Sequence, residues 1–303
     1  MSSVPTSFVF FGSATASIYV LDELKKAGML PVLIVTTPDK PVGRGLTLTP
    51  TPVKIWAHEH DVPVFDPAKL DAEFVKKLGK KMEEIAQEKN AAIAPVFIVA
   101  AYGKIIPQAV LDLPKRGALN VHPTLLPLYR GSSPLHSTIL DDAKKTGVTI
   151  MHIDALMDHG PIVVQKEITI KEWPTYDVFE EMMLREGGKI LAEILPDWVA
   201  GTISEKEQDH AAATLTRKVS KQDGLVDFKD LSSDSPKTQY DIFRKIQAFH
   251  EWPSVYFFTN EKARIKITQA AWRNNTLVIE KVIPEGKKET DYATFLKNSG
   301  VKI

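Results

Sequence analysis

The stretch FVFFGSATASIYVLDELKKAGMLPVLIV, residues 8–35, contains the pattern of a strand, a helix and a second strand in succession. The run Phe8–Phe11 is continuously apolar, which is typical of a strand that is buried on both faces. Apolar residues then recur at helical spacing over residues 14–27, and a second apolar run follows at residues 32–35. This order favours a parallel sheet covered by helices.

The same alternation continues through the first two hundred residues. Further strands are predicted at residues 62–65, 95–100, 117–121, 148–153 and 162–168, and further helices at residues 53–60, 71–88 and 175–200. The predicted fold class is therefore α/β, with a doubly wound, mostly parallel, Rossmann-like sheet. Ligands of such sheets bind beyond the carboxyl ends of the strands. The ends of interest are Gly12, Tyr102-Gly103 and Asn120–His122.

The pattern changes in the last third of the chain. Residues 202–213 are polar and predict a linker between a catalytic domain at 1–201 and a second domain at 214–303. In the second domain, a helix near 238–249 precedes strands predicted at 255–259, 263–267 and 276–283 without helices between them. A smaller, mainly β domain is expected, OB-like and shortened.

Composition restricts the class of protein. Hydrophobic residues make up 44% and charged residues 25% of the chain, as in a soluble globular protein. There is no apolar run of the ~18–20 residues that cross a bilayer, and no signal-peptide pattern at the N-terminus. The chain has no cysteine, which excludes disulfides and thiolate metal sites. A cytoplasmic location without membrane attachment is expected.

Charge offers less guidance on the partner. The formal net charge is zero, which counts against a dedicated nucleic-acid binder, although the last third of the chain is slightly basic. The segment PDKPVGRG, residues 38–45, contains two prolines and two glycines and predicts a loop. Lys40 and Arg44 give this loop two positive charges. An ordinary surface loop and a phosphate-binding loop are both consistent with it.

The residues best suited to chemistry begin at Asn120. Asn120 and His122 alternate at the end of a predicted strand, so their side chains lie on one face. Asparagine can donate to a developing oxyanion. Asp154 and Asp158 lie on the loop after the next strand, and one of them can reach His122, fix its tautomer and raise its pKa. The alternative for His122 alone is a hydrogen-bonded core histidine.

Two other chemistries find little support. No serine or cysteine lies in a G-x-S-x-G elbow, so direct attack by a bound amine on an acyl carbon is favoured over a covalent acyl-enzyme. His122, Asp158 and His159 contain metal-ligating atoms, but no H-E-x-x-H segment presents two histidines on one helical face. No metal is expected.

Together these motifs resemble those of a known family. The segments Asn120-Val-His122, Leu125-Leu126-Pro127 and Arg130-Gly131, with Asp158 before Gly160, resemble the formyltransferases that use 10-formyltetrahydrofolate. Residues 38–45, Tyr102-Gly103, residues 218–221 and Trp252-Pro253 resemble the branch that formylates methionyl-tRNA. The resemblance extends from about residue 8 to residue 258.

The resemblance implies a role for each matching residue. Asn120, His122 and Asp158 become the catalytic set, and Arg44 and Lys40 become contacts to the acceptor end of initiator methionyl-tRNA. The residues implied to bind 10-formyltetrahydrofolate are Tyr102, Gly103, Ile105, Thr124, Leu125, Leu126 and Pro127. A monomer is expected. The family commonly has Ser at the position of Thr124 and Thr at that of His159, so hydrogen bonding around Asp158 is expected to differ.

A basic strand is the second feature that suggests tRNA. Lys262, Arg264 and Lys266 alternate with apolar residues, so a strand there has three cations on one face. That face is either ordinary solvated surface or a phosphate contact. Rival functions are formyl transfer to an amino sugar nucleotide, formyltetrahydrofolate hydrolysis, and a non-enzymatic RNA-binding module fused to an inert α/β domain.

Overall fold

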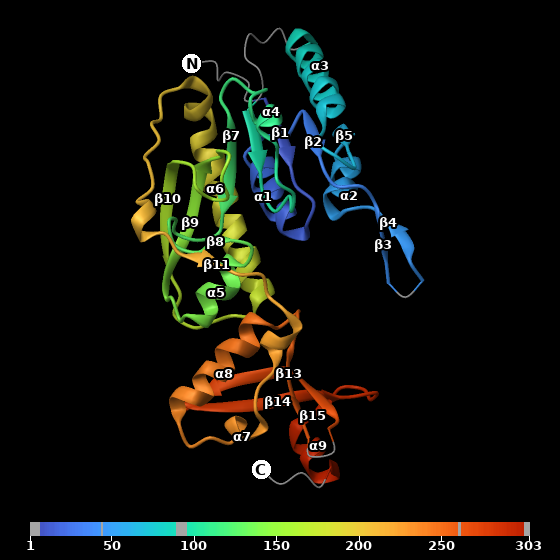
Figure 1. Ribbon diagram of the computed structural model, residues 1–303, viewed down its shortest axis with the longest axis vertical. Helices are drawn as coiled ribbons and strands as arrows, with labels where there is room; N and C mark the ends of the chain where they lie inside the picture. The colour runs from blue at the N-terminus through green and yellow to red at the C-terminus, as the bar shows by residue number, and fades with distance from the viewer. Residues whose placement is uncertain (1–6, 44, 89–95, 260–261, 300–303) are drawn as a thin grey trace. The chain divides into compact units, whose positions relative to one another are not determined.

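The computed structural model describes residues 7–43, 45–88, 96–259 and 262–299. The chain forms two compact units (Figure 1). The first contains Met1–Arg130, Gly147–Ile168 and Glu181–Thr214, and the second Gly131–Thr146, Thr169–Glu180 and Leu215–Ile303. The two units are therefore interleaved along the chain, whereas the sequence predicts sequential domains joined at residues 202–213.

A seven-stranded sheet with strand order β10-β9-β7-β6-β1-β2-β5 forms the centre of the first unit. Its strands are β1 (Phe8–Phe11), β2 (Leu33–Val35), β5 (Val64–Phe65), β6 (Val96–Val99), β7 (Ala118–His122), β9 (Lys145–His152) and β10 (Ile162–Thr169). The pairs from β5 to β7 are parallel, and β7 pairs with β9 in antiparallel register. The predicted mostly parallel α/β sheet is confirmed.

Apolar helix faces cover this sheet. The helices are α1 (Thr15–Lys26), α2 (Pro52–Glu59), α3 (Ala72–Glu88), α4 (Gln108–Leu111) and α6 (Tyr176–Ala200). In α3, Phe74 and Leu78 pack with Phe11 and Phe97 of the strands in one buried cluster. Each such side chain contributes about 1.5–3 kcal/mol when fully buried. None of the described helices is long and apolar enough to span a membrane.

Two adjacent glycines allow α6 to approach β7 closely. A Cβ atom at Gly187 would lie 2.4 Å from Cγ1 of Val121, and one at Gly188 would lie 2.9 Å from Cβ of Glu23 in α1. Val121 therefore faces α6. Because strand residues alternate between faces, Asn120 and His122 point to the other side of the sheet.

Residues 38–45, predicted as a loop, are partly strand. Strands β3 (Lys40–Val42) and β4 (Thr47–Thr49) form an antiparallel hairpin that projects from the sheet (Figure 1). Pro41 is tolerated because a two-stranded ribbon leaves one edge of each strand unpaired. Lys40 is exposed, as are Leu46 and Leu48, whereas Arg44 lies outside the described residues.

The second unit is built on a four-stranded antiparallel sheet. Its strands, in order, are β12 (Val255–Phe258), β13 (Arg264–Arg273), β14 (Thr276–Pro284) and β15 (Thr290–Asp291). Its helices are α5 (Pro134–Leu140), α7 (Phe228–Leu231), α8 (Pro236–Ala248) and α9 (Tyr292–Ser299), and the short strands β8 (Arg130–Gly131) and β11 (Leu215–Thr216) pair with each other. The predicted mainly β character is confirmed, with one strand more than predicted and with helices that the sequence pattern missed.

Candidate active site

The candidate catalytic residues lie at the carboxyl end of β7. Val99 of β6 is opposite Asn120 on one side, and Thr149 of β9 is opposite His122 on the other. His122 is only 3% exposed. The carboxamide of Asn120 is partly buried and makes no hydrogen bond among the described residues, which leaves its donors for a ligand.

Both ring nitrogens of His122 have a defined neighbour. Nε2 lies 3.2 Å from the carbonyl oxygen of Tyr129, to which it donates. Nδ1 lies 3.6 Å from Oδ1 of Asp158, too long for a hydrogen bond but close enough for an ion pair once the ring is charged. Nδ1 is thus the nitrogen that can accept a proton.

Burial dominates the ionisation of this histidine. Desolvation lowers the pKa of His122 below its ordinary value, and the Asp158 carboxylate only partly opposes this effect. The cation of Arg130 lowers the pKa further. The Asp158 carboxylate does raise this pKa, as the sequence predicts, but the net shift is downward, because the fold removes water from the ring.

Of the two candidate carboxylates, Asp158 is the one that faces His122. Asp154 instead binds His159, with Oδ2 2.6 Å from Nδ1. The ring of His159 in turn stacks on that of His210, with centroids 4.0 Å apart. The loop therefore uses Asp154 and His159 for its own structure, and Asp158 is the carboxylate beside His122.

Gly160 fixes the end of the loop that carries Asp158. A Cβ atom at Gly160 would lie 2.0 Å from the carbonyl oxygen of His152, the last residue of β9. Only glycine permits this approach. Asp158 itself has a φ of +50°, a left-handed conformation that non-glycine residues seldom adopt. The loop is thus held in one strained shape above β7.

The residues implied to bind folate differ in accessibility. Tyr102 is buried in an edge-to-face contact with Phe11, and burial raises its pKa to about 12. Thr124 is buried too, and its hydroxyl donates to the carbonyl of Leu128. Ile105, by contrast, is 84% exposed. Of the remaining four residues, Leu126 is buried, Leu125 and Pro127 are half-buried, and Gly103 is exposed. Apolar contact surface here comes from Ile105, Leu125 and Pro127.

The predicted basic face is present on β13 in part. Arg264 is exposed and Lys266 half-buried, while Ile265 and Ile267 point into the core of the second unit. The guanidinium of Arg264 lies over the ring of Tyr256, 5.7 Å from its centroid. Lys262 precedes the strand and has a φ of +62°, so strand alternation does not extend to it.

Gly12 directly follows β1 and is the first of the three strand ends of interest. The backbone N–H of Gly12 donates to the carbonyl of Val35, and that of Ser13 to the carbonyl of Ala101. A Cβ atom at Gly12 would also lie 2.6 Å from the Phe10 ring. The glycine is therefore required for packing, and its N–H group is already used inside the protein.

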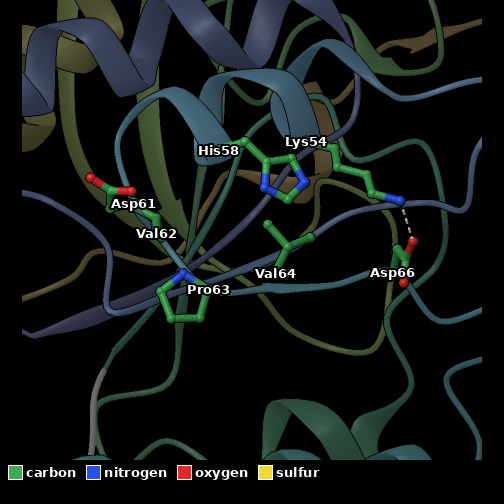
Figure 2. A pocket seen from close by; sticks show the side chains of 7 residues that line it. All are labelled: Lys54, His58, Asp61, Val62, Pro63, Val64 and Asp66. Atoms are coloured by element: carbon green, nitrogen blue, oxygen red, sulfur yellow. Dashed lines mark hydrogen bonds and ion pairs between the residues drawn. The ribbon is translucent and has the colours of Figure 1, made fainter.

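A hollow of about 450 Å³ lies at the opposite edge of the sheet, beside β5 (Figure 2). Its charged residues include Lys54, whose ammonium is 2.8 Å from both Asp39 and Asp66. These carboxylates neutralise the cation, and β7 is separated from β5 by β6, β1 and β2. The hollow therefore lies away from the strand end that carries Asn120 and His122. No cluster that could hold a metal ion is found among the described residues.

Two residues near the site had no role assigned from the sequence. Arg130 is only 6% exposed and Gln208 only 5% exposed, and they are hydrogen-bonded to each other. Gln208 lies in the segment predicted as a linker, where a single glutamine among polar residues carries no signal. Its importance depends on contacts some fifty positions away along the chain.

Comparison with known proteins gives consistent matches. Residues 6–195 match the family described as formyl transferase. A methionyl-tRNA formyltransferase of Geobacillus sp. (strain WCH70) is 35% identical, with 97% of this chain and 95% of that protein covered. One of Chloroflexus aggregans is 38% identical over 82% of this chain and 75% of its own. A structure of methionyl-tRNA formyltransferase from Clostridium thermocellum has a TM-score of 0.58 at 15% identity and covers 92% of this chain and 98% of that one, a likeness of fold.

Proposed function

The chain belongs to the formyl transferase family, and we propose that it moves a formyl group from 10-formyltetrahydrofolate to the α-amine of methionyl initiator tRNA. One observation carries the proposal. Buried His122 lies on the strand that also presents Asn120 and faces the Asp158 carboxylate of the loop after β9, in a chain that aligns over 97% of its length with a methionyl-tRNA formyltransferase.

His122 acts as the proton carrier in this proposal. Its lowered pKa keeps the ring neutral in the resting enzyme, so Nδ1 can accept a proton at neutral pH. An α-amine has a pKa of about 8, lower in an ester, so much of it is already nucleophilic. As the amine nitrogen bonds to the formyl carbon, it gives its proton to Nδ1. The Asp158 carboxylate, 3.6 Å away, stabilises the imidazolium.

Asn120 stabilises the charge that collects on the formyl oxygen. Its carboxamide has no partner among the described residues, and an oxyanion-hole donor typically contributes a factor of about 10²–10³ in rate. His122 then returns its proton to the folate nitrogen, and the bond from that nitrogen to the formyl carbon breaks. The amine proton thus ends on the leaving group, and no covalent enzyme intermediate is needed.

The donor and acceptor bind on different kinds of surface. For the folate donor, exposed Ile105 and half-buried Leu125 supply apolar contact. For the tRNA, the proposal uses Lys40 on the hairpin, together with Arg44, and the face of Arg264 and Lys266 on β13. Exposed cations suit phosphates, and binding through them is strongly salt-dependent.

A competition among acceptors tests the function directly. Purified enzyme with 10-formyltetrahydrofolate would be given initiator methionyl-tRNA, elongator methionyl-tRNA, an amino sugar nucleotide, or no acceptor. We expect rapid formylation of the initiator only, measured as acid-stable formylmethionine. Faster transfer to the sugar, or folate hydrolysis at the same rate without acceptor, would replace this proposal with the corresponding alternative.

A further inference from the structure

The carboxamide of Gln208 joins the Asp158 loop to the buried Arg130. Its Nε2 donates to the carbonyl oxygens of Gly160, at 2.7 Å, and Asp158, at 3.1 Å. Its Oε1 accepts from Nε of Arg130 at 3.1 Å and from Nη2 at 2.6 Å. Both donors and both lone pairs of the amide are therefore used.

These contacts allow only one orientation of the amide. A flipped carboxamide would present its oxygen to two carbonyl oxygens and its NH₂ group to a guanidinium, which has no acceptor. Arg130 is itself restrained, because Nη2 also donates to Nδ1 of His210, at 2.9 Å. The donors of Gln208 are thus aimed at the loop by a buried cation.

Gln208 contacts the loop at Asp158, a residue whose backbone conformation requires support. Asp158 is in the left-handed region, with a φ of +50°. Residues other than glycine seldom adopt this conformation, and it persists only where the surroundings enforce it. The same residue presents its carboxylate to His122. Fixing the Asp158 carbonyl therefore also fixes the direction of the carboxylate.

We propose that Gln208 is a positioning residue, which holds the Asp158 carboxylate toward His122 and is itself oriented by Arg130. This inference rests on the proposed catalytic role of Asp158. Residues 202–213, predicted as a linker, would then contribute to the reaction through Gln208, which acts on Asp158 rather than on a substrate.

Two substitutions separate positioning from simple structural support. Gln208→Glu keeps the oxygen that pairs with Arg130 but replaces the donor nitrogen by an oxygen that faces two carbonyls. Gln208→Met keeps the length of the side chain and removes every polar contact. Gln239→Met is the matched control, because the Gln239 amide also bridges two backbone groups, the Ser233 carbonyl and the Leu277 N–H, in the second unit.

We expect both Gln208 variants to lower kcat for formyl transfer by about 10–100-fold, since small misplacements of a catalytic group have effects of this size. KM for tRNA and for the folate should change little. Gln239→Met should keep kcat, even if it lowers the melting temperature as much. Unchanged kcat in Gln208→Glu would overturn the inference, because this variant keeps the Arg130 pairing, loses the donors to the loop and adds a negative charge that faces two carbonyl oxygens.

A double-mutant cycle with Asp158→Asn gives the decisive readout. If Gln208 acts through Asp158, Gln208→Met should cause little further loss in the Asp158→Asn background, whereas independent structural damage would multiply. The acid limb of the kcat–pH profile should also move to lower pH in Gln208→Met, because the Asp158 carboxylate raises the pKa of His122. Multiplicative losses with an unmoved acid limb would overturn the inference. Near-normal transfer by Asp158→Asn alone would instead overturn the proposed catalytic role of Asp158.

Discussion

Two histidines, buried His122 in the first unit and half-buried His136 in the second, both have a lowered pKa but different surroundings. Burial lowers the pKa of His122, and burial lowers the pKa of His136 to about 4. His122 faces the Asp158 carboxylate and the Tyr129 carbonyl. His136 stacks on Tyr176, with ring centroids 4.1 Å apart. Among the described residues, the His122 ring therefore lies beside polar groups, and the His136 ring packs on an aromatic side chain.

The different neighbours of the two rings show that a lowered pKa does not by itself make a histidine a useful base. A neutral buried imidazole is useful as a base only if the cation it becomes is stabilised at once. His122 faces a carboxylate that can stabilise its cation, whereas His136 packs against the aromatic rings of Tyr176 and Phe249. The two sites therefore predict opposite responses to substitution.

Loss of His122 should have the largest effect. We expect His122→Ala to lower kcat for formyl transfer by about 10³-fold or more, within the range for general acid–base groups, and Asp158→Ala to do nearly as much. His136→Phe, which preserves the stacking, should leave kcat unchanged. Rates would be measured with initiator methionyl-tRNA, and circular dichroism would check the fold. Near-normal rates in both site variants would refute the mechanism.

Substitution of Asn120 should have the next largest effect on kcat. Asn120→Ala is expected to lower kcat by about 10²–10³-fold, because the developing oxyanion loses a donor. Asn120→Asp should be at least as harmful, since it places negative charge where charge develops. Equal activity of the two variants and the wild-type enzyme would show that the oxyanion is stabilised elsewhere.

Substitution of His136 should change the pH dependence of protein stability rather than the rate of formyl transfer. In the folded state its pKa is about 4, against 6.5 in the unfolded chain, so only the unfolded state takes up the proton between these values. The contribution of His136 is complete above pH 6.5 and decreases as the pH falls toward 4, by about 3 kcal/mol in total.

Denaturant titrations of wild type and His136→Phe at several pH values would measure this contribution. Other groups affect both proteins alike, so the difference between them isolates His136. We expect the variant to gain relative stability as the pH falls from 6.5. Parallel pH profiles would mean that His136 is hydrated in solution.

Substitution of the cations at and before β13 should have the smallest effect, and it should act on tRNA binding. Replacing Lys262, Arg264 and Lys266 by Gln should weaken tRNA binding by on the order of tenfold and reduce the slope of log K against log salt by about one per lost phosphate contact. Stability should hardly change. Lys69, Lys76 and Lys80, three exposed lysines of the first unit, provide a control with equal loss of charge. Equal affinities and slopes in both triple variants would remove β13 from the interface.

The sequence predicted best what depends on short-range pattern. The continuous apolar run of β1 and the periodic apolar residues of α1 and α3 gave element positions within one or two residues. The alternation of Asn120 and His122 likewise predicted their common face. Family membership, first indicated by these motifs, is confirmed by the comparisons.

What the sequence could not supply depends on distant contacts. The direction of the His122 pKa shift follows from packing around the ring, which no local pattern records. Asp154 and Asp158 looked equivalent until the fold paired Asp154 with His159. The hairpin at Lys40–Thr49 was hidden by the two prolines and two glycines of residues 38–45. Helix α5 begins with a proline after three small residues, so its seven residues carry little periodic signal.

The interleaving of the two units has a consequence for the protein during its synthesis. In the second unit, α5 packs on α8, where the guanidinium of Arg244 donates to the carbonyl of Leu140. On the ribosome, α8 emerges about a hundred residues after α5, a delay of roughly 5–20 s at ordinary elongation rates. For that time Leu135 and Ile139, buried in the finished protein, lack this partner. The nascent chain therefore exposes these apolar side chains for that time, and a chaperone that binds apolar segments can act on them.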